Sequence, residues 1–201
     1  LLPDQHGVLR GKRIPAQELL KVYEQGLYLP GSVFALDING NTVESTGIGF
    51  DTGDCDQPCR VIPHTLTMVP WQNKPVAQCL IAMEQTPGEA YFANPRHVLD
   101  RICDQYQSQG LTPMVAVELE FYLTDAKRLK SGLLQPPIAP ITGLRESDTQ
   151  VYAVDNLDDY SALLDDIVLA AQGQNIPAST AVAEYAPGQF EINLQHVADP
   201  V

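Results

Sequence analysis

Long runs of apolar residues are missing from this 201-residue sequence. No stretch approaches the roughly 20 apolar residues that a membrane-spanning helix needs. The first residues, LLPDQHGVLRGKR, also lack the charged segment followed by an apolar segment that marks a signal peptide. These absences predict a cytoplasmic protein without a membrane partner. With 44% hydrophobic residues, the chain still has enough apolar side chains to build a folded core.

Positive charge is also scarce. Lys and Arg together number 12, against 25 Asp and Glu, so the formal net charge is -13. Such a chain repels nucleic acids and anionic lipids, and an anionic substrate would need a local cation to screen the charge. The balance therefore argues against a nucleic-acid partner and makes a divalent metal ion the obvious candidate for that cation.

Recognisable zinc and nucleotide motifs are absent as well. Cys55 and Cys59 form one Cys-x-x-x-Cys spacing, but no second pair and no nearby histidine completes a zinc site. We expect all four cysteines to be free thiols. The chain also has no phosphate-binding glycine loop of the Walker type.

The N-terminal half contains short elements separated by turns. Apolar residues recur at helical spacing between positions 15 and 25, and Gly26 stands where a helix would end. The segment SVFALDINGNTVEST predicts a hairpin with a type I′ turn at Asn39-Gly40. We then expect a long loop in GIGFDTGDCDQPCRVIP, a strand in VAQCLIAM and a linker in EQTPGEAYFANP.

The C-terminal half alternates helices and strands. Asn94 and Pro95 predict the start of a helix that Gly110 ends. A strand follows in VAVELEFYL (115–123), then a helix with an apolar stripe over 160–171, and a last strand in FEINLQH. Helices and strands in this order indicate an α+β fold.

Two carboxylates interrupt the strand at 115–123. Residues at i and i+2 share one face of a strand, so Glu118 and Glu120 project together, about 7 Å apart. Their repulsion amounts to roughly 2–3 kcal/mol at an effective dielectric constant near 20. Exposure to solvent would remove most of that cost, so the pair fits either a solvated sheet face or a cation site.

A second acidic stretch favours the cation site. Glu184 and Glu191 lie on either side of Ala-Pro-Gly-Gln, and a Pro-Gly pair makes a tight turn that can fold the two carboxylates back toward each other. Four ionised acids in one cleft would repel by on the order of 10 kcal/mol, so they must either take up protons or hold cations. Oxygen ligands without Cys or a nearby His select Mg²⁺ or Mn²⁺ over zinc.

The stretches VELEFYL and EYAPGQFEINL together resemble the glutamine synthetase superfamily, and the loop GFDTGDCD adds to the resemblance. The likeness spans nearly the whole chain. It implies a β-grasp-like N-terminal domain at 1–90, followed at 91–201 by the first part of a catalytic domain whose antiparallel strands line a funnel between subunits. The chain would then be the N-terminal part of a homo-oligomeric enzyme.

The resemblance also implies an activity and a set of site residues. Family members form γ-glutamyl phosphate from glutamate and ATP and then let an amine displace the phosphate. By motif matching, Glu120, Glu184 and Glu191 correspond to the carboxylates of one Mg²⁺ or Mn²⁺ site, and Glu118 to a ligand of the other. Asp51 corresponds to the catalytic aspartate that binds and deprotonates the incoming ammonium.

The loop around Asp51 departs from the usual pattern. Glutamine synthetases usually continue with Gly-Ser-Ser, whereas this chain continues with Thr-Gly-Asp-Cys-Asp. The additional acids, Asp54 and Asp56, fit a second positive charge on the amine, which resembles the glutamate–polyamine ligases, including the γ-glutamylputrescine synthetases. A solvated acidic loop explains the same residues.

Several other family motifs are not found in these 201 residues. They are a metal-binding histidine, an Asn-Gly segment for glutamate, and arginines for the phosphates. The residues that bind ATP and glutamate are therefore not identified. We expect structural or surface roles for the four histidines, His6, His64, His97 and His196.

Three interpretations of the activity remain. The first is a glutamate–amine ligase, using a polyamine such as putrescine or using ammonia. The second is a non-catalytic binding or assembly module. The third, a two-carboxylate glycosidase, fits poorly because Glu118 and Glu120 lie on one strand instead of across a sugar cleft.

Overall fold

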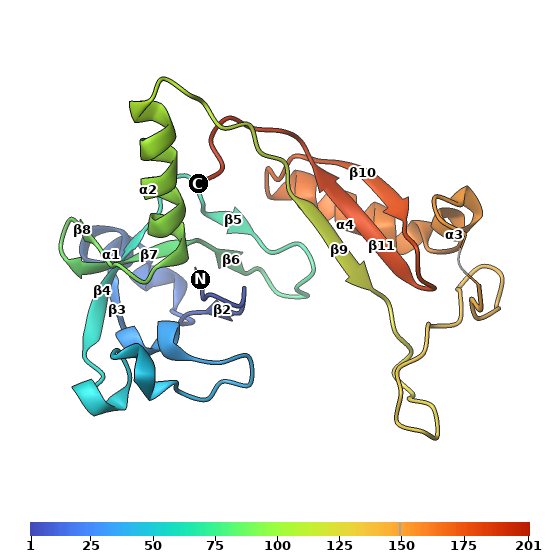
Figure 1. Ribbon diagram of the computed structural model, residues 1–201, viewed down its shortest axis with the longest axis horizontal. Helices are drawn as coiled ribbons and strands as arrows, with labels where there is room; N and C mark the ends of the chain where they lie inside the picture. Colours follow the sequence, from blue (N-terminus) through green and yellow to red (C-terminus); the bar gives the residue numbers. More distant parts are fainter. Residues whose placement is uncertain (149) are drawn as a thin grey trace. The chain divides into compact units, whose positions relative to one another are not determined.

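The computed structural model describes residues 1–148 and 150–201, which form two compact units (Figure 1). Unit 1 comprises residues 1–68, 74–113 and 199–201, and unit 2 comprises residues 69–73 and 114–198. Helices and strands occur in both, and every strand pairing described is antiparallel. The α+β class predicted from the sequence is confirmed. The domain boundary at residue 90 stays a prediction.

Unit 1 contains a four-stranded sheet in the order β3-β4-β7-β8. Its strands are β3 (Leu27–Pro30), β4 (Asp56–Val61), β7 (Ile81–Thr86) and β8 (Glu89–Ala90). Two short strand pairs accompany it: β1 (Leu2–Pro3) with β2 (Leu9–Arg10), and β5 (Thr67–Met68) with β6 (Ala77–Gln78). The helices are α1 (Leu19–Gln25) and α2 (Pro95–Ser108), with 3-10 turns η1 (Ala16–Glu18), η2 (Gly31–Ala35), η3 (Glu44–Thr46) and η4 (Phe50–Thr52).

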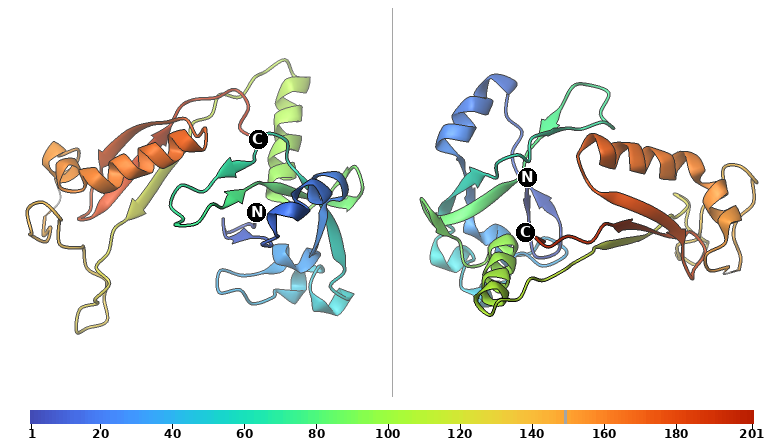
Figure 2. Two further views of the ribbon diagram at one scale, coloured as in Figure 1. Left: turned by 180° about the vertical axis from the view of Figure 1, so that it is seen from behind. Right: turned by 90° about the horizontal axis from the view of Figure 1, so that it is seen from above.

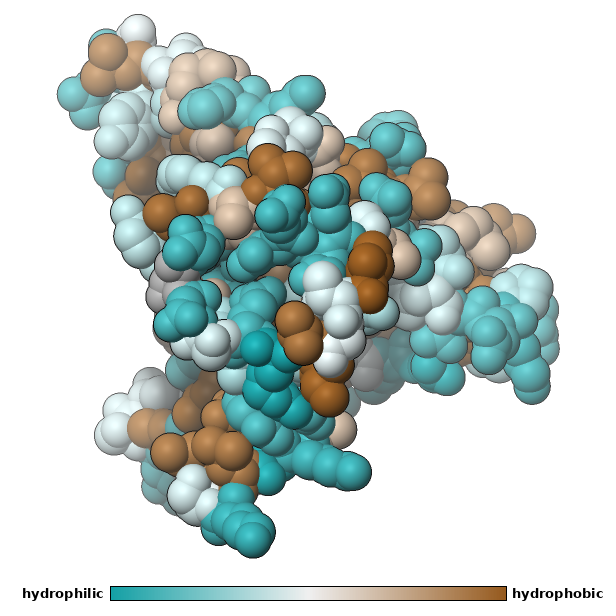
Figure 3. Space-filling view, turned by 90° about the vertical axis from the view of Figure 1, so that its right-hand side faces the viewer, coloured by the Kyte–Doolittle hydropathy of each residue, from teal (hydrophilic) through white to brown (hydrophobic). Residues whose placement is uncertain are grey.

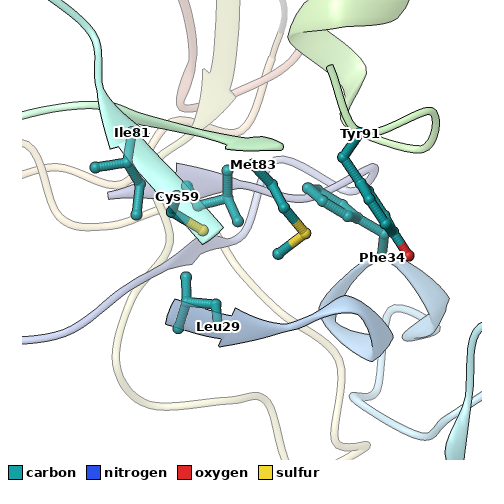
Figure 4. Packing of buried hydrophobic residues seen from close by; sticks show 7 residues of the cluster. Leu29, Phe34, Cys59, Ile81, Met83 and Tyr91 are labelled. Atoms are coloured by element: carbon teal, nitrogen blue, oxygen red, sulfur yellow. The ribbon is translucent and has the colours of Figure 1, made fainter. Parts of the chain in front are cut away.

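The core of unit 1 forms between the sheet and the segments that cross it. Met83 on β7 and Cys59 on β4 are fully buried, and they face Leu29 of β3 (Figure 4). Phe34 and Tyr91 stack with ring centroids 5.9 Å apart, which joins η2 to the segment after β8. The ring contact holds η2 in place beside the segment that follows β8.

The sequence predicted three segments of unit 1 incorrectly. The expected hairpin at 32–46 is a 3-10 turn followed by a single bridge between Leu36 and Thr42. Its loop is closed by the carboxylate of Asp37, which accepts bonds from the backbone N–H groups of Asn39 and Asn41 at 2.8 and 2.9 Å. Gly40 has a φ of 85° while Asn39 does not have a positive φ, so the turn is not type I′.

The other two differences concern strands. The second half of the expected loop at 47–63 is β4. This strand pairs with both β3 and β7, and it carries the buried Cys59. The expected linker at 84–95 contains the end of β7 and all of β8, which form a hairpin. Both segments are rich in proline and glycine, which led the prediction to loops. The sheet nevertheless contains Pro58 within β4, opposite Tyr28 of β3.

Helix α2 begins where the sequence predicted. The side chain of Asn94 accepts a hydrogen bond from the backbone N–H of Arg96 at 3.2 Å, and Pro95 occupies the first helical position. Cys103 is the buried residue of this helix. Four apolar side chains of this helix are 39–45% exposed: Val98, Leu99, Ile102 and Tyr106.

Unit 2 is a three-stranded sheet covered on one face by a helix (Figures 1 and 2). The strands are β9 (Glu118–Tyr122), β10 (Ala178–Ala183) and β11 (Gln189–Leu194), in the order β10-β11-β9. The helices are α3 (Val154–Asp159) and α4 (Ser161–Gly173). Strands β9 and β11 and helix α4 were expected from the sequence, apart from shifts of a few residues at their ends, whereas β10 was not predicted.

The core of unit 2 lies between α4 and the face of the sheet that it covers. Phe190 on β11 is 1% exposed and meets the ring of Tyr160 edge-on at 5.1 Å. Leu164 of α4 and Ile192 of β11 complete this contact. Phe121 of β9 packs here, whereas Val117 and Leu119 are 46% and 50% exposed.

The surface carries apolar side chains in many places. In the view of Figure 3, small groups of hydrophobic residues are interspersed with hydrophilic ones. Among the described residues, no helix combines the length and the apolar character needed to cross a bilayer.

Candidate active site on the open sheet face of unit 2

The pairing of β9 with β11 places acidic side chains opposite each other. Glu120 is directly opposite Glu191, and Glu118 is opposite Asn193. Directly opposed residues of antiparallel strands have Cβ atoms about 5 Å apart, and their side chains lie on the same face. Leu119 and Phe121 alternate with these acids and project to the other face, where Phe121 packs against the core and Leu119 is 50% exposed.

Glu184 joins the same face from β10. Ala183 is opposite Phe190, and the backbone N–H of Glu184 donates to the carbonyl oxygen of Gln189 at 2.9 Å, which extends the pairing by one residue. Glu184 therefore lies on the same face as Gln189, Glu191 and Glu120. All four glutamates predicted from the sequence project from one face of the sheet, opposite the covered core. Glu118 and Glu120 are exposed, while Glu184 and Glu191 are half-buried.

Two carboxamides orient two of these carboxylates. The Nε2 of Gln189 donates a hydrogen bond to Oε1 of Glu120, and its Oε1 accepts one from the backbone N–H of Ala186 at 2.9 Å. The Nδ2 of Asn193 donates to Oε1 of Glu191 at 2.6 Å. In each case the hydrogen bond occupies one carboxylate oxygen and leaves the other for a further ligand. Sequence reasoning missed both amides, although Gln189, Glu191 and Asn193 are spaced two residues apart, as Glu118 and Glu120 are.

The turn between β10 and β11 is held by Glu146, which the sequence did not single out. Gly188 has a φ of 75°, and a Cβ atom there would lie 2.7 Å from the carbonyl oxygen of Leu123. Its backbone N–H donates to Oε2 of Glu146 at 2.7 Å. Burial, and then the charges of Glu146 and Asp159, raise the pKa of Tyr160 to about 12. Glu146 is 42 residues away in the chain, so no local pattern identifies it.

The chemistry of this face fits a hard cation. The four glutamates offer carboxylate oxygens, which suit Mg²⁺ and Mn²⁺. Within residues 1–148 and 150–201, no group of three or more His, Cys, Asp or Glu side chains is close enough together to hold a metal ion. The acids of this face thus have the right type and orientation, and further ligands or a closer approach would be needed to enclose an ion.

Asp51 lies in unit 1, on the exposed 3-10 turn η4. The backbone N–H groups of Phe50 and Asp51 donate to the two carboxylate oxygens of Glu44 at 3.3 and 3.1 Å. Downstream, Asp54 has a φ of 46°, and its buried Oδ1 has no hydrogen-bond partner in the part of the chain that the structure describes. A buried carboxylate oxygen without a donor is an acceptor for a cationic or N–H-bearing group.

All four cysteines lie in unit 1. Cys59 and Cys103 are buried, Cys55 is exposed, and all four cysteines are free thiols as predicted. Burial raises the pKa of the Cys59 thiol to about 11. The Nε2 of His97 is 3.2 Å from the carbonyl oxygen of Met83, which is a structural contact within unit 1.

The sequence of this chain is similar to those of known proteins. A family model described as glutamine synthetase, catalytic domain, matches residues 92–201. The chain is 48% identical over 196 residues to gamma-glutamylputrescine synthetase PuuA of Escherichia coli (strain K12), covering 98% of this chain and 41% of that protein. It is 28% identical to glutamate–isopropylamine ligase of a Pseudomonas species, covering 96% of this chain and 42% of that protein.

Solved structures share its fold. A structure described as a novel glutamine synthase homolog aligns with a TM-score of 0.76 at 18% identity, over 98% of this chain and 42% of that one. A GmaS/ADP complex aligns with a TM-score of 0.72 at 20% identity, over 98% and 40%. The chain therefore spans about two fifths of the length of these relatives. With the family model matching more than half of its residues, the chain belongs to the glutamine synthetase family.

Proposed function

We propose that the whole protein is an ATP-dependent ligase that joins the γ-carboxylate of glutamate to an amine, with a polyamine such as putrescine as the acceptor. The observation that carries this proposal is the single sheet face with Glu118, Glu120, Glu184 and Glu191. The relationship to a γ-glutamylputrescine synthetase and to a glutamate–isopropylamine ligase supports this reaction class.

The reaction has two steps. A γ-carboxylate oxygen of glutamate attacks the γ-phosphorus of ATP, which forms γ-glutamyl phosphate and releases ADP. The amine nitrogen then attacks the acyl carbon, forming the amide and expelling inorganic phosphate. Before that attack the ammonium group must lose a proton, and Asp51 is the proposed base.

Glu120, Glu184 and Glu191 would hold one divalent ion, and Glu118 would ligate a second. Bound Mg²⁺ or Mn²⁺ would supply charge neutralisation for the phosphoryl group. Gln189 and Asn193 would keep two of these carboxylates oriented. The open face thus carries the proposed ligands, and the packing of the covered face fixes the strands that carry them.

The acceptor is proposed from the loop around Asp51. A diamine such as putrescine is a dication, so one ammonium would meet Asp51 while the other remains charged. Asp54 and Asp56 offer negative charge for that second group, and Asp54 Oδ1 has no hydrogen-bond partner among the described residues. Ammonia carries no second charge and would leave these acids without a role in binding.

We further propose that the whole protein is a cytoplasmic homo-oligomer, in which the Asp51 loop completes the active site of a neighbouring subunit. The runner-up functions are a glutamine synthetase that uses ammonia, and a non-catalytic assembly module. We propose that residues 1–201 alone lack ligase activity, because the other family motifs are not among them.

The test is a phosphate-release assay of the whole protein with ATP, glutamate and Mg²⁺, comparing putrescine with ammonia, and with Asp51→Asn alongside. Product formation with putrescine at a much higher kcat/KM than with ammonia is the expected result. Preference for ammonia would support the glutamine synthetase alternative, and no turnover with either would support the non-catalytic one.

A further inference from the structure

We infer that Glu44 is a positioning residue for the amine-binding loop, setting the orientation of Asp51 through its backbone. This inference rests on the proposed role of Asp51 and adds a determinant of amine specificity that the sequence motifs do not include. It is carried by three features of residues 42–53: the contacts of Glu44, the space left by Gly49, and the way the loop is anchored.

The carboxylate of Glu44 binds two consecutive backbone N–H groups. Its Oε1 accepts from Phe50 at 3.3 Å and its Oε2 accepts from Asp51 at 3.1 Å. These N–H groups begin η4 and have no partner within that turn. Hydrogen bonds to an ionised carboxylate are stronger than neutral ones, so Glu44 holds the peptide planes on both sides of the Phe50 Cα.

Gly49 leaves the space that this carboxylate occupies. A Cβ atom at Gly49 would lie 2.4 Å from Oε2 of Glu44 and 2.9 Å from Cγ2 of Thr42. Its φ of -90° is accessible to any residue, so the glycine is required by the close approach and not by its backbone conformation. Glu44 and Gly49 therefore work as a pair.

The pair is anchored to the core of unit 1. The backbone N–H of Val43 donates to the carbonyl oxygen of the buried Ala35 at 2.8 Å, which fixes the residue before Glu44. On the far side, the N–H of Gly53 donates to the carbonyl oxygen of Phe50 at 2.9 Å. The loop is held from within, while the side chains of Phe50 and Asp51 remain exposed.

The expected consequence is selective. Loss of the Glu44 carboxylate frees the peptide groups of Phe50 and Asp51 and lets the Asp51 side chain sample other directions. Binding and deprotonation of the amine should suffer, whereas phosphoryl transfer from ATP to glutamate should not. A residue that merely stabilises the fold would not separate the substrates in this way.

The experiment compares Glu44→Ala, Glu44→Gln and Gly49→Ala in the whole protein, with Glu24→Ala as an exposed acidic control from the same unit. Steady-state kinetics gives kcat/KM for putrescine and KM for glutamate and ATP. Amide hydrogen exchange of the peptide covering residues 49–53 reports the loop directly.

For Glu44→Ala we expect kcat/KM for putrescine to fall roughly tenfold or more, with KM for glutamate and ATP unchanged and faster exchange in residues 49–53. Glu44→Gln should be intermediate, because one amide oxygen can still accept. Gly49→Ala should resemble Glu44→Ala, and the double variant should lose less than the sum of the two.

Two kinetic outcomes overturn the inference. One is a Glu44→Ala variant with normal amine kinetics beside an impaired Asp51→Asn, and the other is an equal loss for all three substrates. Wild-type kinetics in Asp51→Asn would instead overturn the proposed role of Asp51. Unchanged exchange at residues 49–53 in Glu44→Ala would remove the structural basis of the inference whatever the kinetics show.

Discussion

The two units present their acids by different physical means. In unit 2 the glutamates lie on paired strands, so the pleat of the sheet sets their direction and the core beneath them fixes the strands. In unit 1 Asp51 lies on an exposed 3-10 turn, and one side chain, Glu44, holds the backbone on which it stands. A strand-borne site is thus supported by many residues, whereas the loop-borne site depends on a few.

This difference also decided what the sequence could predict. Alternation in VELEFYL placed Glu118 and Glu120 on one face, because a period of two is a local property that strand pairing preserves. The Pro-Gly turn predicted that Glu184 and Glu191 fold back toward each other, and the strand pairings of unit 2 place both pairs on one face. Glu146 and Gln189 were missed, since their contacts are with residues far apart in the chain. Asn193 was missed although its contact with Glu191 lies within one strand.

In unit 1, local patterns misled more often. The Asn-Gly pair indicated a two-residue hairpin, but Asp37 closes a longer loop with its own carboxylate, and the stacking of Phe34 on Tyr91 holds the preceding residues in a 3-10 turn. Strand β4 was masked by its glycine- and proline-rich surroundings. Helix α2 was predicted well because its start is marked by Asn94 and Pro95 themselves.

The largest effect should come from removing a strand-borne ligand. Glu120→Ala in the whole protein is expected to lower ligase turnover on the order of 10³-fold, comparable to the loss of one key electrostatic group. Its melting temperature should change little, because Glu120 is exposed and the covered face stays intact.

Phosphate release and thermal unfolding provide the two readouts for Glu120→Ala. Asp165→Ala, an exposed acid on α4, is the matched control and should behave as wild type. Near-normal turnover in Glu120→Ala would contradict the metal assignment.

A second prediction addresses the support beneath the sheet. Phe190→Ala removes a ring that is 1% exposed and should destabilise the fold by about 3–5 kcal/mol. Leu169→Ala on α4, where the side chain is 63% exposed, should cost far less. Denaturant unfolding of both variants measures the difference, and equal losses would argue against the core described for unit 2.

A third prediction concerns acid stability in unit 1. Burial of Asp4 opposes ionisation, but hydrogen bonds from Arg10, His6 and Val8 outweigh it and hold the pKa of Asp4 below its usual 3.8. A lowered pKa in the folded state means that the stabilisation is present above pH 3.8 and is lost as the pH falls through the folded value.

Asp4→Asn removes the ion pair with Arg10, in which the two groups are 2.8 Å apart, and should cost about 1–3 kcal/mol at pH 7. The difference from wild type should shrink as the pH is lowered below 3.8. Urea titrations at several pH values test this. A difference that is constant with pH would show that the charge of Asp4 is not the cause.

The most direct test of the central claim, that the open face of unit 2 holds divalent metal, is a Mn²⁺ titration of the whole protein followed by electron paramagnetic resonance of the free ion. Glu120→Gln and Glu191→Gln should each weaken Mn²⁺ binding roughly tenfold or more, while Asp51→Asn binds as wild type. Wild-type Mn²⁺ affinity in both glutamate variants would contradict the account.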